Sequence, residues 1–152
     1  MLPKENKLDS EKVTLIKSRF LRSSRRGSWL ISNDLPASFR YAFQGLIYAF
    51  LSQRNFRIHV LFGTFAFGLG VWLQLNFIHL AVLVLTVAAV LVLELINTSI
   101  EAVVDLSIGR RFHPLAKIAK DCAAASVLVA SISSLFIATL LLFPPFLSRL
   151  GS

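Results

Sequence analysis

The stretch IHLAVLVLTVAAVLVLELINTSIEAVVD, residues 78–105, determines the fold of this chain. Its first sixteen residues contain no Asp, Glu, Lys or Arg, and its second part carries Glu94, Asn97, Glu101 and Asp105. At 100° per residue, these four side chains fall within roughly 80° of one another on a helix. Ionisable groups in an apolar helix are costly and therefore indicate a functional site. Such a stripe suits Mg²⁺ binding, phosphate chemistry or a proton relay.

Apolar sequence extends on both sides of this stretch. No Asp, Glu, Lys or Arg lies between Arg57 and Glu94 or between Asp121 and Arg149, and the mean hydropathy of the 152 residues is +0.69. Each stretch exceeds the roughly 20 residues that cross a bilayer. We therefore expect an all-α integral membrane protein of one domain, with three transmembrane helices. Their approximate bounds are 58–75, 78–106 and 115–143.

A further helix is expected before the first span. Asp34 precedes Leu35 and Pro36, which is the pattern of a helix start. Apolar residues then recur at helical spacing from Phe39 to Phe50. This pattern predicts an amphipathic helix over residues 35–52 that lies in the membrane interface. The expected division of the chain is a basic arm (1–33), a membrane domain (34–147) and a short tail (148–152).

The positive charge of the chain is unevenly distributed. The formal net charge is +8, and eleven of the sixteen Lys and Arg residues precede Ile58. Four more lie between Arg110 and Lys120. Positive loops are retained in the cytoplasm and attract anionic lipid headgroups, so we expect a cytoplasmic amino terminus and an external carboxyl terminus. No aromatic-interleaved basic motif is present, so no nucleic-acid partner is expected.

The polar stripe extends from lipid depth towards water. Counted from Ile78 at 1.5 Å per residue, Glu94 lies about 24 Å along, within a hydrocarbon core of about 30 Å. Glu101 lies about 35 Å along, at the level of the inner headgroups. Lys120 and Asp121 enter the next apolar stretch at a similar level. A soluble anion and a membrane-embedded alcohol meet at such a place, which favours group transfer from a soluble donor to a lipid.

These residues also carry a resemblance to a known family. The segment ELINTSIEAVVD (94–105), followed by AKD (119–121) and the small run AAA (123–125), is similar to the prokaryotic diacylglycerol kinase/undecaprenol kinase family. The similarity extends from about Ser38 to Phe143 and includes the entry segment FRYAFQG (39–45). It implies a small lipid kinase in a bacterial inner membrane, with three spans and a surface helix. It also implies a homotrimer that uses ATP and Mg²⁺.

The resemblance assigns roles to individual residues. Glu94 matches the catalytic base, and Asn97 is expected to orient either the Glu94 carboxylate or the lipid headgroup. Glu101 matches a Mg²⁺ ligand beside the nucleotide phosphates, which suits a hard carboxylate oxygen. The remaining matches are nucleotide-contacting positions, with Lys120 as the partner of the phosphate oxygens. These positions are Tyr41, Asp105, His113, Lys120 and Asp121.

One position departs from the family pattern. The family commonly has a second metal-binding glutamate before the first span, where this chain has Gln53. An amide oxygen still binds Mg²⁺, but more weakly and without a negative charge. The chain also lacks the glycine-rich phosphate loop G-x-x-x-x-G-K-[ST]. Phosphate would therefore have to be held by the Lys, Asp and Glu side chains together with Mg²⁺.

Two other classes of function fit part of the pattern. A small oligomeric proton or ion carrier would use Glu94 and Glu101 as a relay and would need no nucleotide. A non-catalytic membrane anchor would use the basic arm and would tolerate substitution of Glu94. Within the kinase class, diacylglycerol is the first expected substrate and undecaprenol the alternative. The motif residues handle phosphate rather than the lipid tail, so they leave both lipids open.

Overall fold

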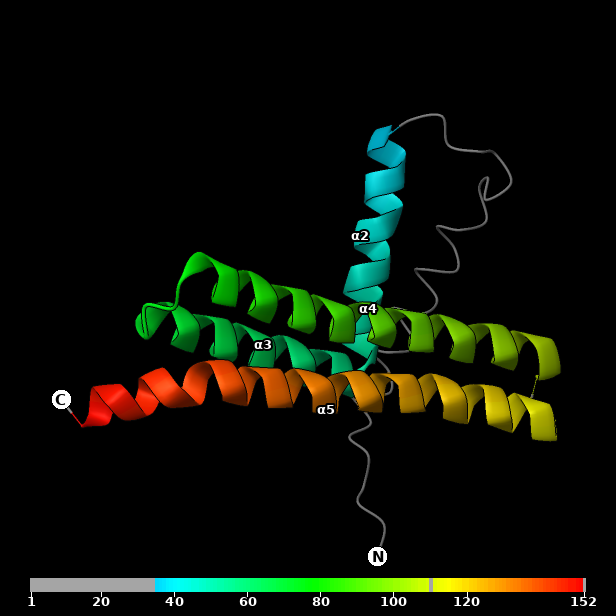
Figure 1. Ribbon diagram of the computed structural model, residues 1–152. Helices are drawn as coiled ribbons and strands as arrows, with labels where there is room; N and C mark the ends of the chain where they lie inside the picture. Colours follow the sequence, from blue (N-terminus) through cyan, green and yellow to red (C-terminus); the bar gives the residue numbers. More distant parts are fainter. Residues whose placement is uncertain (1–34, 110, 152) are drawn as a thin grey trace, which may run out of the picture. The chain divides into compact units, whose positions relative to one another are not determined.

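The computed structural model describes residues 35–109 and 111–151, which form helices joined by short connections (Figure 1). This described part contains no β-strand, so the predicted all-α fold is confirmed. The predicted basic arm 1–33, the proposed helix start at Asp34, and Arg110 lie outside the described residues. The chain divides after Arg54 into two units, which are described separately.

The described part of the first unit is helix α2, Leu35–Ser52. Its bounds match the helix predicted over residues 35–52. The end of α2 is closed by two bonds to the preceding turn. The Ser52 hydroxyl donates to the Tyr48 carbonyl at 2.7 Å, and the Gln53 amide donates to the Ala49 carbonyl at 2.8 Å.

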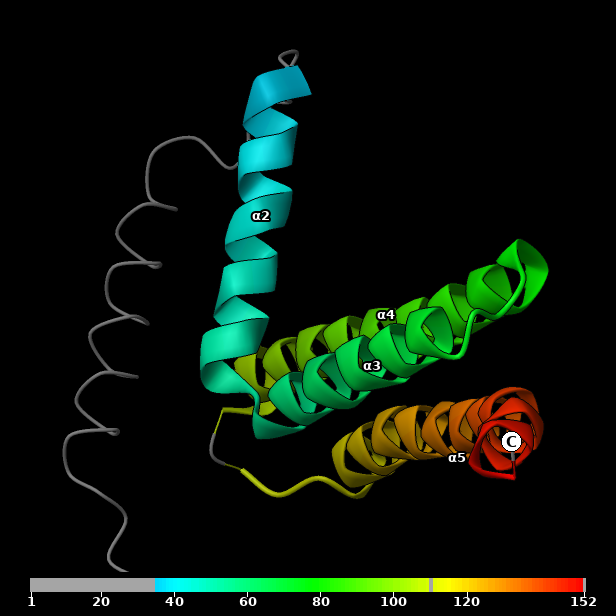
Figure 2. The same ribbon diagram turned by 90° about the vertical axis from the view of Figure 1, so that its left-hand side faces the viewer.

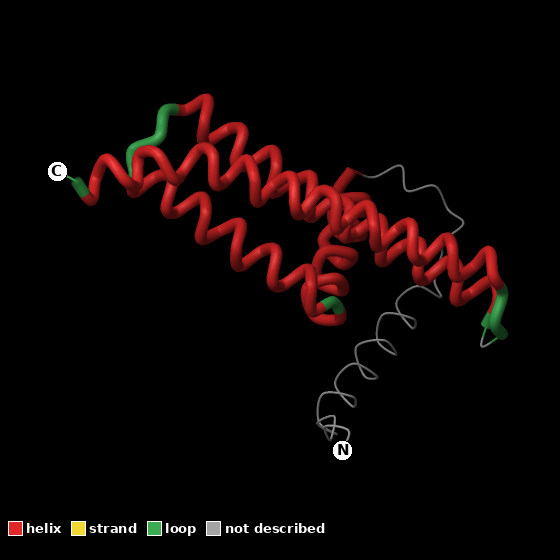
Figure 3. The backbone as a smooth tube through the Cα atoms, turned by 60° about the horizontal axis from the view of Figure 1, so that its bottom comes forward, coloured by secondary structure: helices red, strands yellow, loops and turns green. Residues whose placement is uncertain are grey.

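The second unit consists of three helices that run side by side in alternating directions: α3 (Arg54–Trp72), α4 (Phe77–Ile108) and α5 (Pro114–Leu150). Figure 2 shows the same three helices turned by 90°. The tube in Figure 3 shows that the carboxyl terminus lies at the end where α3 turns into α4. The α3–α4 connection and the carboxyl terminus therefore lie at the same end of this unit.

The turns explain where the helices end. Gln74 has a φ of 56°, a left-handed conformation that does not continue a helix, so α3 ends at Trp72 rather than near Leu75. The Asn76 side chain then caps α4 by accepting from the His79 amide at 2.9 Å. At the other end of α4, Gly109 has a φ of 60°, and its amide donates to the Asp105 carbonyl at 2.9 Å.

The prediction that the last helix ends before Pro144 was wrong, because α5 continues through Pro144 and Pro145 to Leu150. A proline removes one amide donor from a helix but keeps its carbonyl, so the next turn still forms. Here the Ser148 hydroxyl donates to the Pro145 carbonyl at 2.8 Å. Arg149 also ties the last turn to α3, since its Nη1 donates to the Trp72 carbonyl at 2.8 Å and its guanidinium lies 4.4 Å from the Trp72 ring centre.

The surface of this unit is apolar. Large side chains are exposed along all three helices, including Leu61, Phe65, Leu85, Leu135 and Leu140. Hydroxyl groups in the same helices donate to carbonyls of their own helix, as expected where no water is present. Helices α4 and α5 are long and apolar enough to cross a membrane. Exposed apolar area of this extent indicates a lipid environment or contact with another chain.

Helix α3 packs closely on α4 because two of its glycines are buried. A Cβ atom at Gly63 would overlap a methyl group of Val87, and one at Gly70 would lie 3.1 Å from Leu80. Glycine at both positions therefore allows the two helix backbones to approach. Gly68, on the same helix, has no atom within 4 Å of such a Cβ and faces open space.

This packing gives a first prediction. We expect Gly63→Ala to lower the stability of the protein by about 1–3 kcal/mol, because the added methyl group forces Val87 and the α4 backbone to shift. Gly68→Ala is the matched control and should leave stability unchanged or slightly higher, since alanine favours a helix. Thermal unfolding of the two variants in the same detergent measures the difference. Equal melting temperatures would contradict the close α3–α4 packing.

Candidate active site

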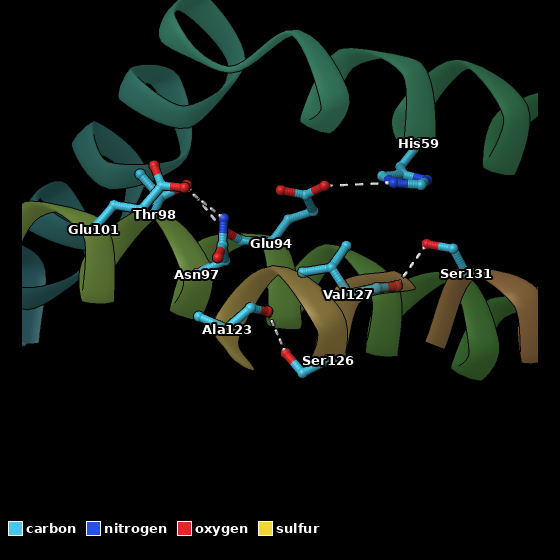
Figure 4. A network of polar contacts seen from close by, with 9 residues as sticks. All are labelled: His59, Glu94, Asn97, Thr98, Glu101, Ala123, Ser126, Val127 and Ser131. Atoms are coloured by element: carbon cyan, nitrogen blue, oxygen red, sulfur yellow. Dashed lines mark hydrogen bonds and ion pairs between the residues drawn. The ribbon is translucent and has the colours of Figure 1, made fainter. Parts of the chain in front are cut away.

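Glu94 is the buried charged residue of the described chain. It lies in the middle of α4 with 4 % of its surface exposed. Its Oε1 atom lies 3.4 Å from Nε2 of His59 on α3 (Figure 4). The same oxygen has no hydrogen-bond partner among the described residues. A buried carboxylate oxygen without a hydrogen-bond donor is costly, so the position of Glu94 indicates a function other than packing.

Asn97 lies one turn after Glu94, but its amide contacts Glu101 instead. Nδ2 of Asn97 donates to Oε1 of Glu101 at 3.1 Å (Figure 4). The amide oxygen of Asn97 is buried and has no partner in the described part of the chain. Of the two roles expected for Asn97, orienting the Glu94 carboxylate is not seen in this geometry. The role towards a lipid headgroup stays a prediction.

Asp105 and Lys120 lie across the α4–α5 connection and form an ion pair. Nζ of Lys120 lies 2.5 Å from Oδ1 of Asp105, and the two side chains are 37 % and 60 % exposed. An ion pair this accessible to water contributes little to stability. It can therefore exchange for contacts with an incoming anion at small cost, which makes Lys120 available to phosphate oxygens.

Asp121 points elsewhere. Its Oδ2 accepts from Nζ of Lys117 at 2.6 Å, one turn back on α5, in a pair that is exposed on both sides. Lys120 and Asp121 are consecutive, so on a helix their side chains leave the axis about 100° apart. The structure thus joins Lys120 to Asp105 and joins Asp121 to Lys117, a residue that sequence reasoning had not selected.

His113 lies at the start of α5 and caps it. Its Nδ1 accepts from the Leu115 amide at 3.2 Å, which fills one of the unpaired donors at the helix start. Its predicted contact with a nucleotide stays a prediction. The cap is a structural role at the start of α5.

The cap at His113 gives a second prediction. We expect His113→Ala to destabilise the protein by about 1 kcal/mol and His113→Asn to be nearly neutral, because asparagine is a good capping residue. Thermal unfolding separates the two variants. The Michaelis constant for ATP, measured on the Asn variant, then reports any nucleotide contact apart from the cap. Equal stability of the two variants would show that the cap contributes nothing.

Tyr41 and Gln53 belong to the first unit. Tyr41 lies on α2 and is exposed, whereas Gln53 is half-buried directly after the end of that helix. Their predicted contacts, Tyr41 with the nucleotide and Gln53 with a metal, stay predictions.

The candidate site residues can hold a Mg²⁺ ion only if substrate oxygens complete the coordination of the ion. Among residues 35–109 and 111–151, no three His, Cys, Asp or Glu side chains gather as a metal site. Mg²⁺, however, commonly takes one or two carboxylates and fills its remaining positions with phosphate oxygens and water. Glu101 is half-buried, and Asn97 fixes its carboxylate, so it fits this kind of ligand.

The polar side chains therefore lie in order along α4. Glu94 lies at apolar depth, Glu101 follows after two turns, or about 10.5 Å, and the Asp105–Lys120 pair lies at the exposed end. The stripe thus begins at the buried Glu94 carboxylate and ends at the exposed Lys120 ammonium. This order suits a helical membrane protein that brings a lipid-soluble group and a soluble anion together.

Comparisons with known proteins identify the class more closely. Residues 40–142 match the family described as prokaryotic diacylglycerol kinase. The chain is 49 % identical over 124 residues to a diacylglycerol kinase of Synechocystis, covering 82 % of this chain and 71 % of the relative. It is 36 % identical over 112 residues to an undecaprenol kinase of Bacillus subtilis (74 % and 90 % covered). It is 34 % identical over 106 residues to a diacylglycerol kinase of Escherichia coli K12 (70 % and 86 % covered).

The chain belongs to the prokaryotic diacylglycerol kinase family. It is a membrane protein and a lipid kinase, and ATP is the co-substrate that a kinase family implies. The predicted resemblance and the predicted class of enzyme are thereby confirmed. The ion-carrier and membrane-anchor alternatives are not favoured.

His59 is the residue at this site that sequence reasoning missed. It was not among the candidate residues selected from the sequence, but it contacts the buried carboxylate of Glu94. A usable signal was present in the sequence. In an antiparallel pair of helices, residues equally far from the turn lie at the same level, and His59 and Glu94 are almost equally far from Asn76.

Proposed function

We propose that this lipid kinase transfers the γ-phosphoryl group of ATP to the hydroxyl of diacylglycerol and forms phosphatidic acid. The observation that carries the proposal is the burial of Glu94 in α4, two turns from Glu101 and on the same helix as the exposed Asp105. The choice of lipid is supported by the 49 % identity to a relative named diacylglycerol kinase over 82 % of this chain.

Glu94 is the proposed general base. Its carboxylate removes the hydroxyl proton of the lipid, and the lipid oxygen attacks the γ-phosphorus. The bond from that phosphorus to the bridging oxygen breaks, and ADP leaves with the electron pair. A base within reach of its proton contributes about 10²–10⁴-fold to rate. The buried position of Glu94 supports this role because a lipid hydroxyl reaches it without leaving the apolar layer.

Lys120 is the proposed partner of the transferred phosphoryl group. Its exposed ion pair with Asp105 opens to admit phosphate, and the ammonium then neutralises charge that builds up on the phosphate oxygens. Asp105, Tyr41, Asp121 and His113 are proposed nucleotide contacts. Asn97 holds the Glu101 carboxylate in place, and its unpartnered amide oxygen is proposed to accept from the lipid headgroup.

Mg²⁺ is the proposed cation. Glu101 would hold it, with Gln53 as a second, weaker ligand. When bound, Mg²⁺ neutralises charge on the nucleotide phosphates. Because Gln53 contributes no negative charge, we propose that this protein binds the metal mainly through Glu101 and the phosphates.

A groove between the helices is the proposed place of the lipid tail. It has a volume of about 660 Å³ and is lined by α3, α4 and α5. Phe62, Phe65 and Leu135 form part of its apolar wall, and His59 lies among its lining residues. His59 also lies 3.4 Å from Oε1 of Glu94, so the groove passes beside a residue that contacts the proposed base.

The arrangement in the membrane is also proposed. α3 is the third span beside α4 and α5, and α2 lies in the interface of a bacterial inner membrane. The amino-terminal arm 1–33 is cytoplasmic and contacts anionic headgroups, and the carboxyl-terminal tail is external. The exposed apolar faces of α3–α5 support lipid contact and a homotrimer of the domain 34–147.

The test is phosphate transfer from labelled ATP by the purified full chain in mixed micelles with Mg²⁺. Diacylglycerol and undecaprenol are offered separately. We expect labelled phosphatidic acid and little labelled undecaprenyl phosphate. The opposite result would assign the chain to undecaprenol. Labelling of neither lipid by folded protein would overturn the proposed reaction.

A further inference from the structure

One oxygen of the Glu94 carboxylate, Oε1, lacks a hydrogen-bond donor among the described residues. Its Oε1 atom is buried and accepts no hydrogen bond within the described residues, and the whole residue is 4 % exposed. A general base has to be ionised before it takes a proton. An ionised carboxylate in apolar surroundings needs a compensating charge nearby. The proposed base therefore raises the question of which group supplies that charge.

The charged and titratable groups near Glu94 on each of the three helices are few. On α3, Nε2 of His59 lies 3.4 Å from Oε1 of Glu94. On α4, Glu101 lies two turns away and has the same sign of charge. The α5 residues drawn in Figure 4 carry no charge: Ala123, Ser126, Val127 and Ser131. The Ser131 hydroxyl is already committed, since it donates to the Val127 carbonyl at 2.8 Å.

His59 is held where it can supply the charge. It is half-buried, and its side chain is 25 % exposed against 5 % for that of Glu94. Gly63, one turn further along α3, brings the two helices together at this level because it carries no side chain to hold Val87 away. The distance of 3.4 Å is too long for a good hydrogen bond but is within ion-pair range. A small movement of either side chain would close it.

We propose that His59 is a positioning residue for Glu94: its imidazole ring, 3.4 Å from Oε1, stabilises the Glu94 carboxylate and keeps it oriented towards the groove in which the lipid lies. The inference rests on the proposed role of Glu94 as the base. His59 itself takes no proton from the lipid. The hydroxyl proton passes to Glu94 while the lipid oxygen forms its bond to phosphorus.

The pH dependence of the reaction tests this role. Without His59 beside it, the ionised carboxylate of Glu94 is less well stabilised. For His59→Phe we expect the acidic limb of the kcat profile to move up by about 1–3 pH units. At pH 7 its kcat should fall about 10- to 100-fold and recover largely at pH 9. The Michaelis constant for ATP should stay within about twofold, because His59 lies away from the Lys120 end.

Two further variants separate charge from shape. His59→Gln keeps a neutral donor of similar size, so it should show the same shift of the acidic limb but a smaller loss at high pH. His79→Phe is the matched control, since His79 is exposed at the start of α4 and only its backbone amide is used in the cap. It should leave the profile unchanged. Melting temperatures in the same detergent exclude unfolded variants.

The protonation of Glu94 is also measurable without turnover. The difference infrared spectrum of wild type against Glu94→Gln shows whether this side chain is a carboxylate or a carboxylic acid. At pH 7 we expect a carboxylate in wild type and a carboxylic acid in His59→Phe. If wild type transfers phosphate but His59→Phe alters neither the acidic limb nor the infrared band, the role of His59 is overturned and the proposed function is kept. An inactive wild-type protein would overturn the proposed function and the inference with it.

Discussion

Replacing Glu94 with glutamine should reduce lipid phosphorylation by about 10²–10⁴-fold, which is the contribution of a positioned general base. Glutamine has nearly the shape of glutamate but accepts no proton. The site around Glu94 is buried, so water cannot easily replace the lost base. The measurement is kcat with labelled ATP and diacylglycerol in mixed micelles. The Michaelis constant for ATP should change little.

The control for Glu94→Gln is Thr98→Val, one turn along α4. The Thr98 hydroxyl donates only to the Glu94 carbonyl, at 2.9 Å, so its loss removes a polar group from the same helix without touching the carboxylate. We expect activity within about threefold of wild type, because the hydroxyl bond is an ordinary, replaceable one. A Glu94→Gln variant as active as Thr98→Val would exclude Glu94 as the base.

Replacing Lys120 with methionine should lower kcat by about 10²–10³-fold, the usual cost of losing one group that stabilises transition-state charge. Methionine keeps the length of the side chain and its helix preference. The Asp105 carboxylate then lacks its partner and repels the nucleotide, so the Michaelis constant for ATP should also rise. Steady-state kinetics with varied ATP separates the two effects.

Lys117→Met is the matched control for Lys120→Met. Lys117 lies one turn before Asp121, with its side chain 65 % exposed, and pairs with Asp121 instead of Asp105. Removing it deletes the same charge from the same helix, so any general effect of surface potential is equal in both variants. We expect kcat for Lys117→Met to stay within about threefold of wild type. Equal losses in the two variants would reduce Lys120 to an interfacial anchor.

Much of the fold follows from local sequence. Continuous apolar stretches longer than a bilayer predict helices whatever their neighbours are. Helix α2 occupies Leu35–Ser52, the range in which polar and apolar residues alternate with helical period. The sequence predicted helix ends less well where backbone geometry or a contact with another helix determines the last turn. Gln74 ends α3 early through its left-handed backbone, and the contacts of Arg149 with Trp72 extend α5 beyond the prolines.

The candidate site divides in the same way. The stripe from Glu94 to Asp105 is a property of one helix, so its spacing was readable from residues 78–105 alone. Which of these side chains pair with one another, and which pair with a residue of another helix, was not readable in this way. Asn97 holds Glu101 rather than Glu94, and Lys120 reaches back across the α4–α5 connection to Asp105.

The sequence by itself determined the helices, the polar stripe along α4 and the family of this lipid kinase. Only the tertiary structure decided that His59 lies against Glu94. The physical reason is that periodicity records which face of a helix is polar, whereas the rotation and height of a neighbouring helix depend on how side chains interlock. Here Gly63 and Gly70 set the approach of α3 to α4, and that approach brings the imidazole to the carboxylate.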